Sequence, residues 1–145
     1  MSHATSEASS DEGHQTETHG FDPELVPDER GRSRRPEPDC PVEVALAAIG
    51  GRWTTLVLRE LMAGPRTFSQ LRTALPELSA KVLTERLQEL TTRGLVHRER
   101  VNAFPVRVRY SLTAAGLALR PLLITLYDTG AAIMRLRAGS PPPRR

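Results

Sequence analysis

The sequence predicts an α+β fold that is mainly helical with one small β-hairpin. Four consecutive segments between residues 41 and 94 place apolar residues at helical spacing, and a long apolar segment follows at 114–137. Between them, two valine-rich segments of alternating character are separated by four residues suited to a hairpin tip. These three observations predict a compact helical domain that carries one β-ribbon.

The charge is distributed unevenly along the 145 residues. Residues 1–39 carry ten Asp and Glu against four Arg, a net charge of −6. Residues 40–145 carry seven acidic residues against sixteen Lys and Arg, a net charge of +9. A globular part this basic favours polyanions as partners, with nucleic acid first among them.

Composition also predicts the domain boundaries. Residues 1–38 nearly lack large apolar side chains, so we expect a disordered acidic tail. One ordered domain should span residues 39–137, and residues 138–145 should form a disordered basic tail. The chain has a single cysteine, no apolar run of about 18 residues and no signal pattern at its N-terminus. We therefore expect a cytoplasmic protein without membrane association, and no metal or cofactor site.

The first two helices are bounded by proline and glycine. Pro41 suits the first position of a helix whose apolar stripe ends at Gly50 and Gly51. A second helix with a broad apolar face begins near Trp53 and ends at Gly64. A lone Trp on such a face is usually part of the core.

The next two helices predict a helix-turn-helix. A short helix over 68–75 ends before Pro76, and a longer helix follows over 79–94 with Ser79 as its N-cap and Gly94 beyond its end. Leucines occupy one side of the longer helix. Its opposite side carries Lys81, Thr84, Glu85 and Gln88. Such a mixture of donors and acceptors can read base edges in a major groove, although most polar helix faces are simply solvated.

The two alternating segments, 95–101 and 106–112, predict a wing after this helix. Arg107 and Arg109 alternate with apolar residues in the second strand, and the first strand adds Arg98 and Arg100. We expect an arginine-lined face of the ribbon that lies along the phosphate backbone or reaches a minor groove. An ordinary hairpin with one solvated face is the alternative.

Thr113 should cap a last helix over 114–137, which Gly130 is placed to kink. This segment is more apolar than packing on a small core requires. The surplus predicts a dimer interface, with packing inside one chain as the alternative.

Several stretches of the chain resemble the HxlR family, a branch of the MarR-like winged-helix transcription regulators. The resemblance covers residues 39–136 and rests on Cys40-Pro41-Val42-Glu43, Ile49-Gly50-Gly51-Arg52-Trp53, "LMAGPRTFSQLRTAL", "LSAKVLTERLQEL", Gly94-Leu95-Val96-His97-Arg98 and Tyr110-Ser111-Leu112-Thr113 with Gly116. The wing departs from the family pattern, because one proline replaces two and Arg109 occupies an acidic position.

The resemblance implies a bacterial-type, homodimeric regulator that dimerises through its N- and C-terminal helices on an inverted-repeat operator. Some members of the family sense oxidants or electrophiles through the cysteine that aligns with Cys40, which makes Cys40 a candidate redox sensor and implies a small-molecule or electrophile inducer. A thiol at a helix N-terminus has a lowered pKa, whereas Asp39 beside it acts in the opposite direction. A small buried residue without chemistry is the alternative.

The leading hypothesis is thus a sequence-specific regulator that binds double-stranded DNA through residues 79–88 and the wing arginines. The alternative is a winged-helix module for protein–protein assembly that reads no DNA sequence. We do not expect an enzyme, because Cys40 has only His97 in the folded region as a partner and lacks a third orienting group.

Overall fold

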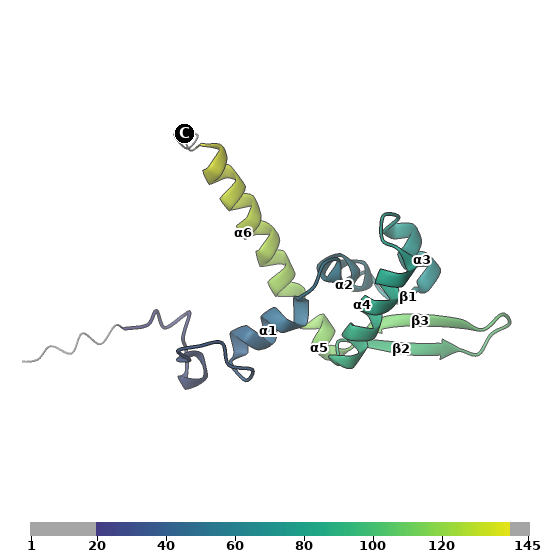
Figure 1. Cartoon of the computed structure of the whole chain (residues 1–145), viewed down its shortest axis with the longest axis horizontal. Helices are drawn as coiled ribbons and strands as arrows, with labels where there is room; N and C mark the ends of the chain where they lie inside the picture. Colours follow the sequence, from purple (N-terminus) through teal and green to yellow (C-terminus); the bar gives the residue numbers. More distant parts are fainter. Residues whose placement is uncertain (1–19, 140–145) are drawn as a thin grey trace, which may run out of the picture.

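The computed structural model describes residues 20–139, in which helices lie beside and at one end of a small antiparallel sheet whose hairpin projects away from them (Figure 1). Along the chain the elements are η1 (Glu29–Gly31), α1 (Pro41–Ile49), α2 (Thr54–Met62), β1 (Arg66–Thr67), α3 (Phe68–Ala74), α4 (Ala80–Thr92), β2 (Val96–Val101), β3 (Arg107–Leu112), α5 (Ala114–Leu117) and α6 (Arg120–Ala138). The four helices predicted between residues 41 and 94 all form. The predicted α+β class is confirmed.

The sheet contains one strand that the sequence does not predict. Arg66 and Thr67 form β1, which pairs with β3 in the strand order β1-β3-β2. Two residues are too few to produce an alternating pattern, so this strand exists because β3 offers it a partner. β1 connects the ribbon to the start of α3.

The core lies between α2, α3, α4 and the base of the ribbon. Its fully buried side chains are Thr54, Val57, Leu58, Leu61, Leu71, Leu78, Leu83, Leu87 and Leu90. Trp53 packs half-buried against this cluster. Thr54 is the one polar member, and its hydroxyl donates to the Gly50 carbonyl at 3.1 Å. Leucines from three helices thus hold the helix-turn-helix against α2.

Local caps define both helices of the helix-turn-helix. The Gln70 amide donates to the Thr67 hydroxyl at 3.2 Å, and the Thr67 amide donates to the Gln70 side chain at 2.9 Å, which is a capping box at α3. The Val82 amide donates to the Ser79 hydroxyl at 3.2 Å at the start of α4. Gly94 has φ 74° just after α4. The predicted ends of α4 are therefore confirmed.

The C-terminal helix differs from the prediction. Instead of one helix over 114–137, α5 stops at Leu117 and α6 begins at Arg120, with Pro121 in its first turn. Gly116 packs so tightly that a Cβ there would lie 2.2 Å from the Leu95 carbonyl oxygen. α6 then continues through Gly130 and extends away from the domain (Figure 1).

The segment Ala114–Ala138 is long and apolar enough to cross a membrane, by length and composition alone, since an 18-residue window within it has a mean hydropathy of 1.3. The expectation based on uninterrupted apolar runs had excluded such a segment. Core helices of soluble proteins meet the same criterion, but those are mostly buried, whereas only 6% of this window is buried. Asp128 lies in the middle of α6, where a bilayer would have to accommodate a carboxylate.

The segment before α1 is described from Gly20 onward. η1 lies against α1, and Asp28 caps it by accepting the Arg30 amide at 2.9 Å. This short helix falls within the predicted acidic tail. The predictions for residues 1–19 and 140–145 lie outside the described residues.

Candidate DNA-binding surface

Helix α4 separates its apolar and polar residues onto opposite sides. Leu83, Leu87 and Leu90 are at most 1% exposed. The side chains predicted to read bases are all exposed, namely Lys81, Thr84, Glu85 and Gln88. The structure thus brings these four residues together on the outer face of α4. The Thr84 hydroxyl donates to the Ala80 carbonyl at 2.8 Å, so its proton is already used within the helix.

The amino end of α4 is exposed at Ser79. Because the Ser79 hydroxyl caps the Val82 amide, its direct role is to complete the first turn. The unpaired amides of that turn and the helix dipole make this end suitable for a phosphate.

The register of the wing contradicts the prediction of one arginine-lined face. Residues directly opposite each other in an antiparallel pair project to the same face. Arg98 pairs with Tyr110 and Arg100 with Val108, whereas Arg109 pairs with Glu99. The remaining arginine, Arg107, pairs with Val101 and shares the face of Arg109. The wing therefore carries two arginines on each face.

Arg109 also has an acidic partner across the strands. Its guanidinium lies 3.4 Å from the Glu99 carboxylate, and both side chains are about half exposed. An exposed pair of this kind contributes little to stability. A DNA phosphate can therefore replace Glu99 as the partner of Arg109 at low energetic cost.

The wing and the helix-turn-helix are joined by β1. Arg66 and Thr67 pair with Tyr110 and Arg109 of β3, and α3 begins at the next residue. Exposed polar residues of α3, among them Ser69 and Arg72, thus lie on an element tied to the wing. In a helix-turn-helix the first helix crosses the DNA backbone. Sequence analysis did not identify these residues, since only the pairing of β1 connects them to the wing.

Cys40 is buried, with 5% exposure, at the N-cap position of α1. The Glu43 amide, together with the Ser33 hydroxyl and the Val42 amide, holds the pKa of the Cys40 thiol below its ordinary value. Burial and the Glu43 carboxylate act in the opposite direction. The opposing carboxylate is thus Glu43, where the sequence suggested Asp39. His97 lies in β2 opposite Ser111.

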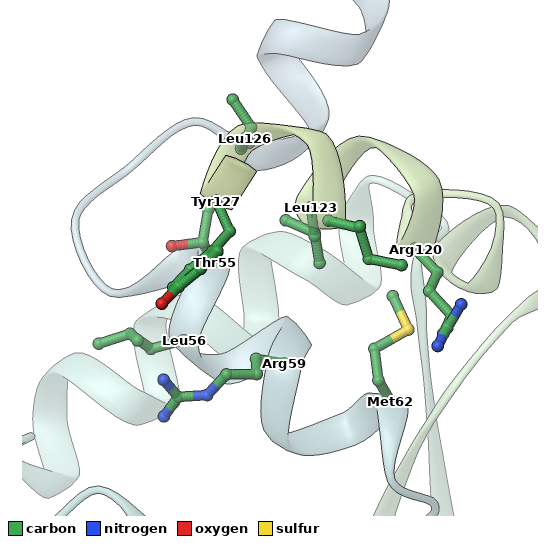
Figure 2. Close-up of a pocket in the computed structure, with 9 residues that line it drawn as sticks. Thr55, Leu56, Arg59, Met62, Arg120, Leu123, Leu126 and Tyr127 are labelled. Atoms are coloured by element: carbon green, nitrogen blue, oxygen red, sulfur yellow. The ribbon is translucent and has the colours of Figure 1, made fainter. Parts of the chain in front are cut away.

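A groove of about 530 Å³ separates α2 from the first turns of α6. Its lining is mainly apolar and comprises Thr55, Leu56, Arg59, Met62, Arg120, Leu123, Ile124, Leu126 and Tyr127. Figure 2 shows the Arg59 and Arg120 guanidinium groups on opposite sides of this groove. Arg59 is paired with Glu60 at 3.0 Å.

Known proteins resemble this chain in both sequence and structure. The HTH-type transcriptional regulator sll1512 of Synechocystis sp. is 42% identical over 92 residues, which cover 63% of this chain and 68% of that protein. The reduced form of the redox regulator HypR superposes with a TM-score of 0.62 at 32% identity, covering 69% of this chain and 99% of HypR.

A third relative is the transcriptional regulator YodB of Bacillus subtilis. Its reduced form gives a TM-score of 0.57 at 36% identity, covering 61% of this chain and 88% of YodB. YodB has also been solved in diamide-treated and quinone-bound forms.

The family model described as HxlR-like helix-turn-helix matches residues 48–137. That range contains α2, the helix-turn-helix, the wing and nearly all of α6. The relatives of this chain are transcriptional regulators rather than enzymes. The fold is a winged helix-turn-helix of MarR-like type, and the polar face of α4 is exposed. This chain therefore belongs to the HxlR-like helix-turn-helix family and is a DNA-binding transcriptional regulator.

Proposed function

We propose that this regulator is a cytoplasmic homodimer that binds an inverted-repeat operator through two copies of α4. The observation that carries the proposal is the outer face of α4, where four exposed polar side chains stand opposite three buried leucines. In a symmetric dimer these faces would enter successive major grooves, and the wings would hold the backbone. The proposed DNA-binding domain spans residues 39–137.

Exposed apolar surface on two helices supports the homodimer. In α1, Val42, Val44 and Leu46 are each more than half exposed. In α6, Tyr127 is 79% and Met134 71% exposed. Apolar surface of this extent is typical of an interaction site. A second copy of the chain would cover it, and the groove beside α2 would receive part of the partner.

We further propose that an electrophile acts as the inducer at Cys40. The lowered pKa of the thiol raises the thiolate fraction, and HypR and YodB are relatives with redox-dependent or quinone-bound structures. Addition to a quinone forms one carbon–sulfur bond: the thiol proton goes to one quinone oxygen, the hydrogen of the attacked ring carbon moves to the other, and the product is a hydroquinone thioether. A Cys40 disulfide between two protomers would instead transfer two electrons and two protons to an oxidant.

The test of DNA reading is binding of the full chain to its own upstream DNA and to a scrambled duplex near physiological salt, where non-specific phosphate contacts weaken. We expect tighter binding to the upstream duplex with two chains bound. Weak and equal binding to both duplexes, together with failure to select a preferred sequence from a random pool, would contradict the proposal and favour the protein-assembly alternative.

Two kinds of variant separate the roles within this surface. Gln88→Ala should change which base pairs are preferred, because a lost base contact alters discrimination by about 1–3 kcal/mol. Removing a wing arginine should weaken binding to all sequences and lower the salt slope by about 1. Since the two arginine pairs face opposite ways, R98A/R100A and R107A/R109A should differ in size of effect. Equal effects of the two double variants would show, contrary to this expectation, that the two faces of the wing contribute equally to DNA binding.

A further inference from the structure

A second side of α4 carries three charged residues, two of which hydrogen-bond to the end of α1 or to the loop that follows it. Arg86, Glu89 and Arg93 follow each other at spacings of three and four residues, so they share one side of the helix. We call them the α4 clamp. None of the three belongs to the face predicted to read bases.

The clamp is held together by Glu89. The Arg86 guanidinium donates to both Glu89 carboxylate oxygens, at 2.8 and 2.9 Å. The Arg93 guanidinium lies 3.7 Å from the same carboxylate. The Arg86 side chain is only 20% exposed, which reduces the screening of this pair by solvent. One carboxylate therefore orients two guanidinium groups.

Both arginines then bind main-chain oxygens, Arg86 in the loop between α1 and α2 and Arg93 at the end of α1. Arg86 Nε donates to the Arg52 carbonyl at 2.8 Å. Arg93 Nη1 donates to the Gly50 carbonyl at 3.1 Å and to the Ala48 carbonyl at 3.3 Å. Carbonyl groups at a helix C-terminus lack partners within the helix and carry partial negative charge, so a guanidinium stabilises them.

The loop that receives the clamp has an unusual backbone. Gly51 has φ 109°, and Trp53 has φ 77°, a left-handed conformation that bulky residues rarely adopt. A Cβ on Gly51 would lie 3.0 Å from the Thr54 hydroxyl oxygen and 3.7 Å from Arg86 Nε. The loop thus exposes its carbonyl groups to α4 in a conformation that the surrounding contacts must maintain. The Gly50-Gly51-Arg52-Trp53 motif has a structural role in this junction.

We propose that Arg86, Glu89 and Arg93 are positioning residues that fix the orientation of α4 relative to α1. This inference rests on the proposed function, in which α1 belongs to the dimer interface and α4 reads a half-site. Under that arrangement, the clamp sets the separation and angle of the two recognition helices.

The experiment measures how binding depends on half-site spacing. Duplexes selected by the wild-type full-length protein from a random pool are resynthesised with the spacer lengthened or shortened by one base pair. Each such change shifts a half-site by about 3.4 Å and rotates it by about 35°. We expect the wild-type dimer to bind the altered spacers much more weakly than the selected spacer.

In R86Q/R93Q we expect this discrimination to fall by at least about fivefold, at the lower end of typical coupling between two sites. Affinity for an isolated half-site should be unchanged. R86Q/R93K should restore part of the discrimination, because Lys keeps the charge, but its single nitrogen cannot both bind the α1 carbonyl groups and approach Glu89 as Nη1 and Nη2 of Arg93 do. The matched control is R30Q/R35Q, which also removes two positive charges, but from exposed ion pairs in the segment before α1, and it should match the wild type.

The outcomes separate the two proposals. A folded R86Q/R93Q protein that keeps the wild-type ratio between spacers would overturn the clamp, even if its affinity fell for all duplexes in equal proportion. If the wild type selects no inverted repeat from the random pool, the proposed function is contradicted, and the clamp proposal that rests on it falls with it. Should the double variant not fold, Glu89→Gln serves in its place, because it removes the bridge but leaves the arginines. An unchanged ratio in E89Q would then overturn the proposal.

Discussion

Helices α4 and α6 are the two long helices of this chain, and they make opposite use of their apolar residues. α4 has 13 residues and buries three leucines in the core of its own domain. α6 has 19 residues, all of them described, and none is buried. An amphipathic helix whose apolar side is buried in the core of its own domain can present its polar side to a ligand. A helix with uncovered apolar residues requires a partner.

The largest expected effect follows from truncating the buried side of α4. Leu87→Ala removes a side chain that is 1% exposed and leaves a cavity, which should lower the free energy of unfolding by about 2–5 kcal/mol. Urea denaturation checks this. The matched control on α6 is Met134→Ala, where 71% of the residue is exposed. At concentrations where the protein is monomeric, that change should stay within about 0.5 kcal/mol of the wild type. Similar losses in both variants would remove the contrast between the helices.

A charge on α6 should have the next largest effect, and it should act on association rather than on folding. Tyr127→Asp places a carboxylate in the proposed dimer interface, where desolvation opposes its burial. We expect the dissociation constant of the dimer to rise at least about tenfold, equivalent to about 1.4 kcal/mol. Sedimentation velocity measures this, with Thr73→Asp on the exposed side of α3 as the control. A dimer unaffected by Tyr127→Asp would place the interface elsewhere and leave the apolar side of α6 unexplained.

The smallest expected effect concerns α1, which would share the interface with α6. Because the pKa of the Cys40 thiol is lowered, its thiolate forms at a lower pH than the thiolate of an ordinary cysteine. The rate of alkylation by iodoacetamide follows the thiolate fraction, so it should begin to rise at a lower pH. Burial should keep the absolute rate below that of a free thiol. Ser33→Ala removes a hydroxyl that stabilises the thiolate, so the midpoint of the rate profile should move to higher pH. Identical profiles for the wild type and Ser33→Ala would exclude this hydroxyl as a cause.

Much of α4 could be predicted because the causes are local. The N-cap at Ser79, the leucine spacing and the left-handed Gly94 all lie within 16 consecutive residues, and the structure confirms each of them. The same reasoning was less successful near the C-terminus. The apolar pattern runs on across Ala118 and Leu119 and predicts one helix, whereas the structure breaks there and starts α6 with Pro121 in its first turn.

Arg93 illustrates why the rest of the site could not be predicted. A cation near the C-terminus of a helix ordinarily complements the carbonyl groups of that same helix. In the structure Arg93 binds the carbonyl groups of Ala48 and Gly50 instead, more than 40 residues earlier in the chain. Spacing along one helix shows which side Arg93 occupies, but it does not show which other element packs against that side.

The sequence by itself determined the fold class, the helices between residues 41 and 94, the polar face of α4 and the basic character of the domain. The reason is that periodicity, capping and charge are properties of residues close together in the chain. Only the tertiary structure decided the pairing of β1 with β3, the division of the wing arginines between two faces and the contact of the α4 clamp with α1. Each of these depends on register or packing between segments distant in the chain. A shift of register by one residue reverses which face a side chain occupies, and the composition of a strand does not record that choice.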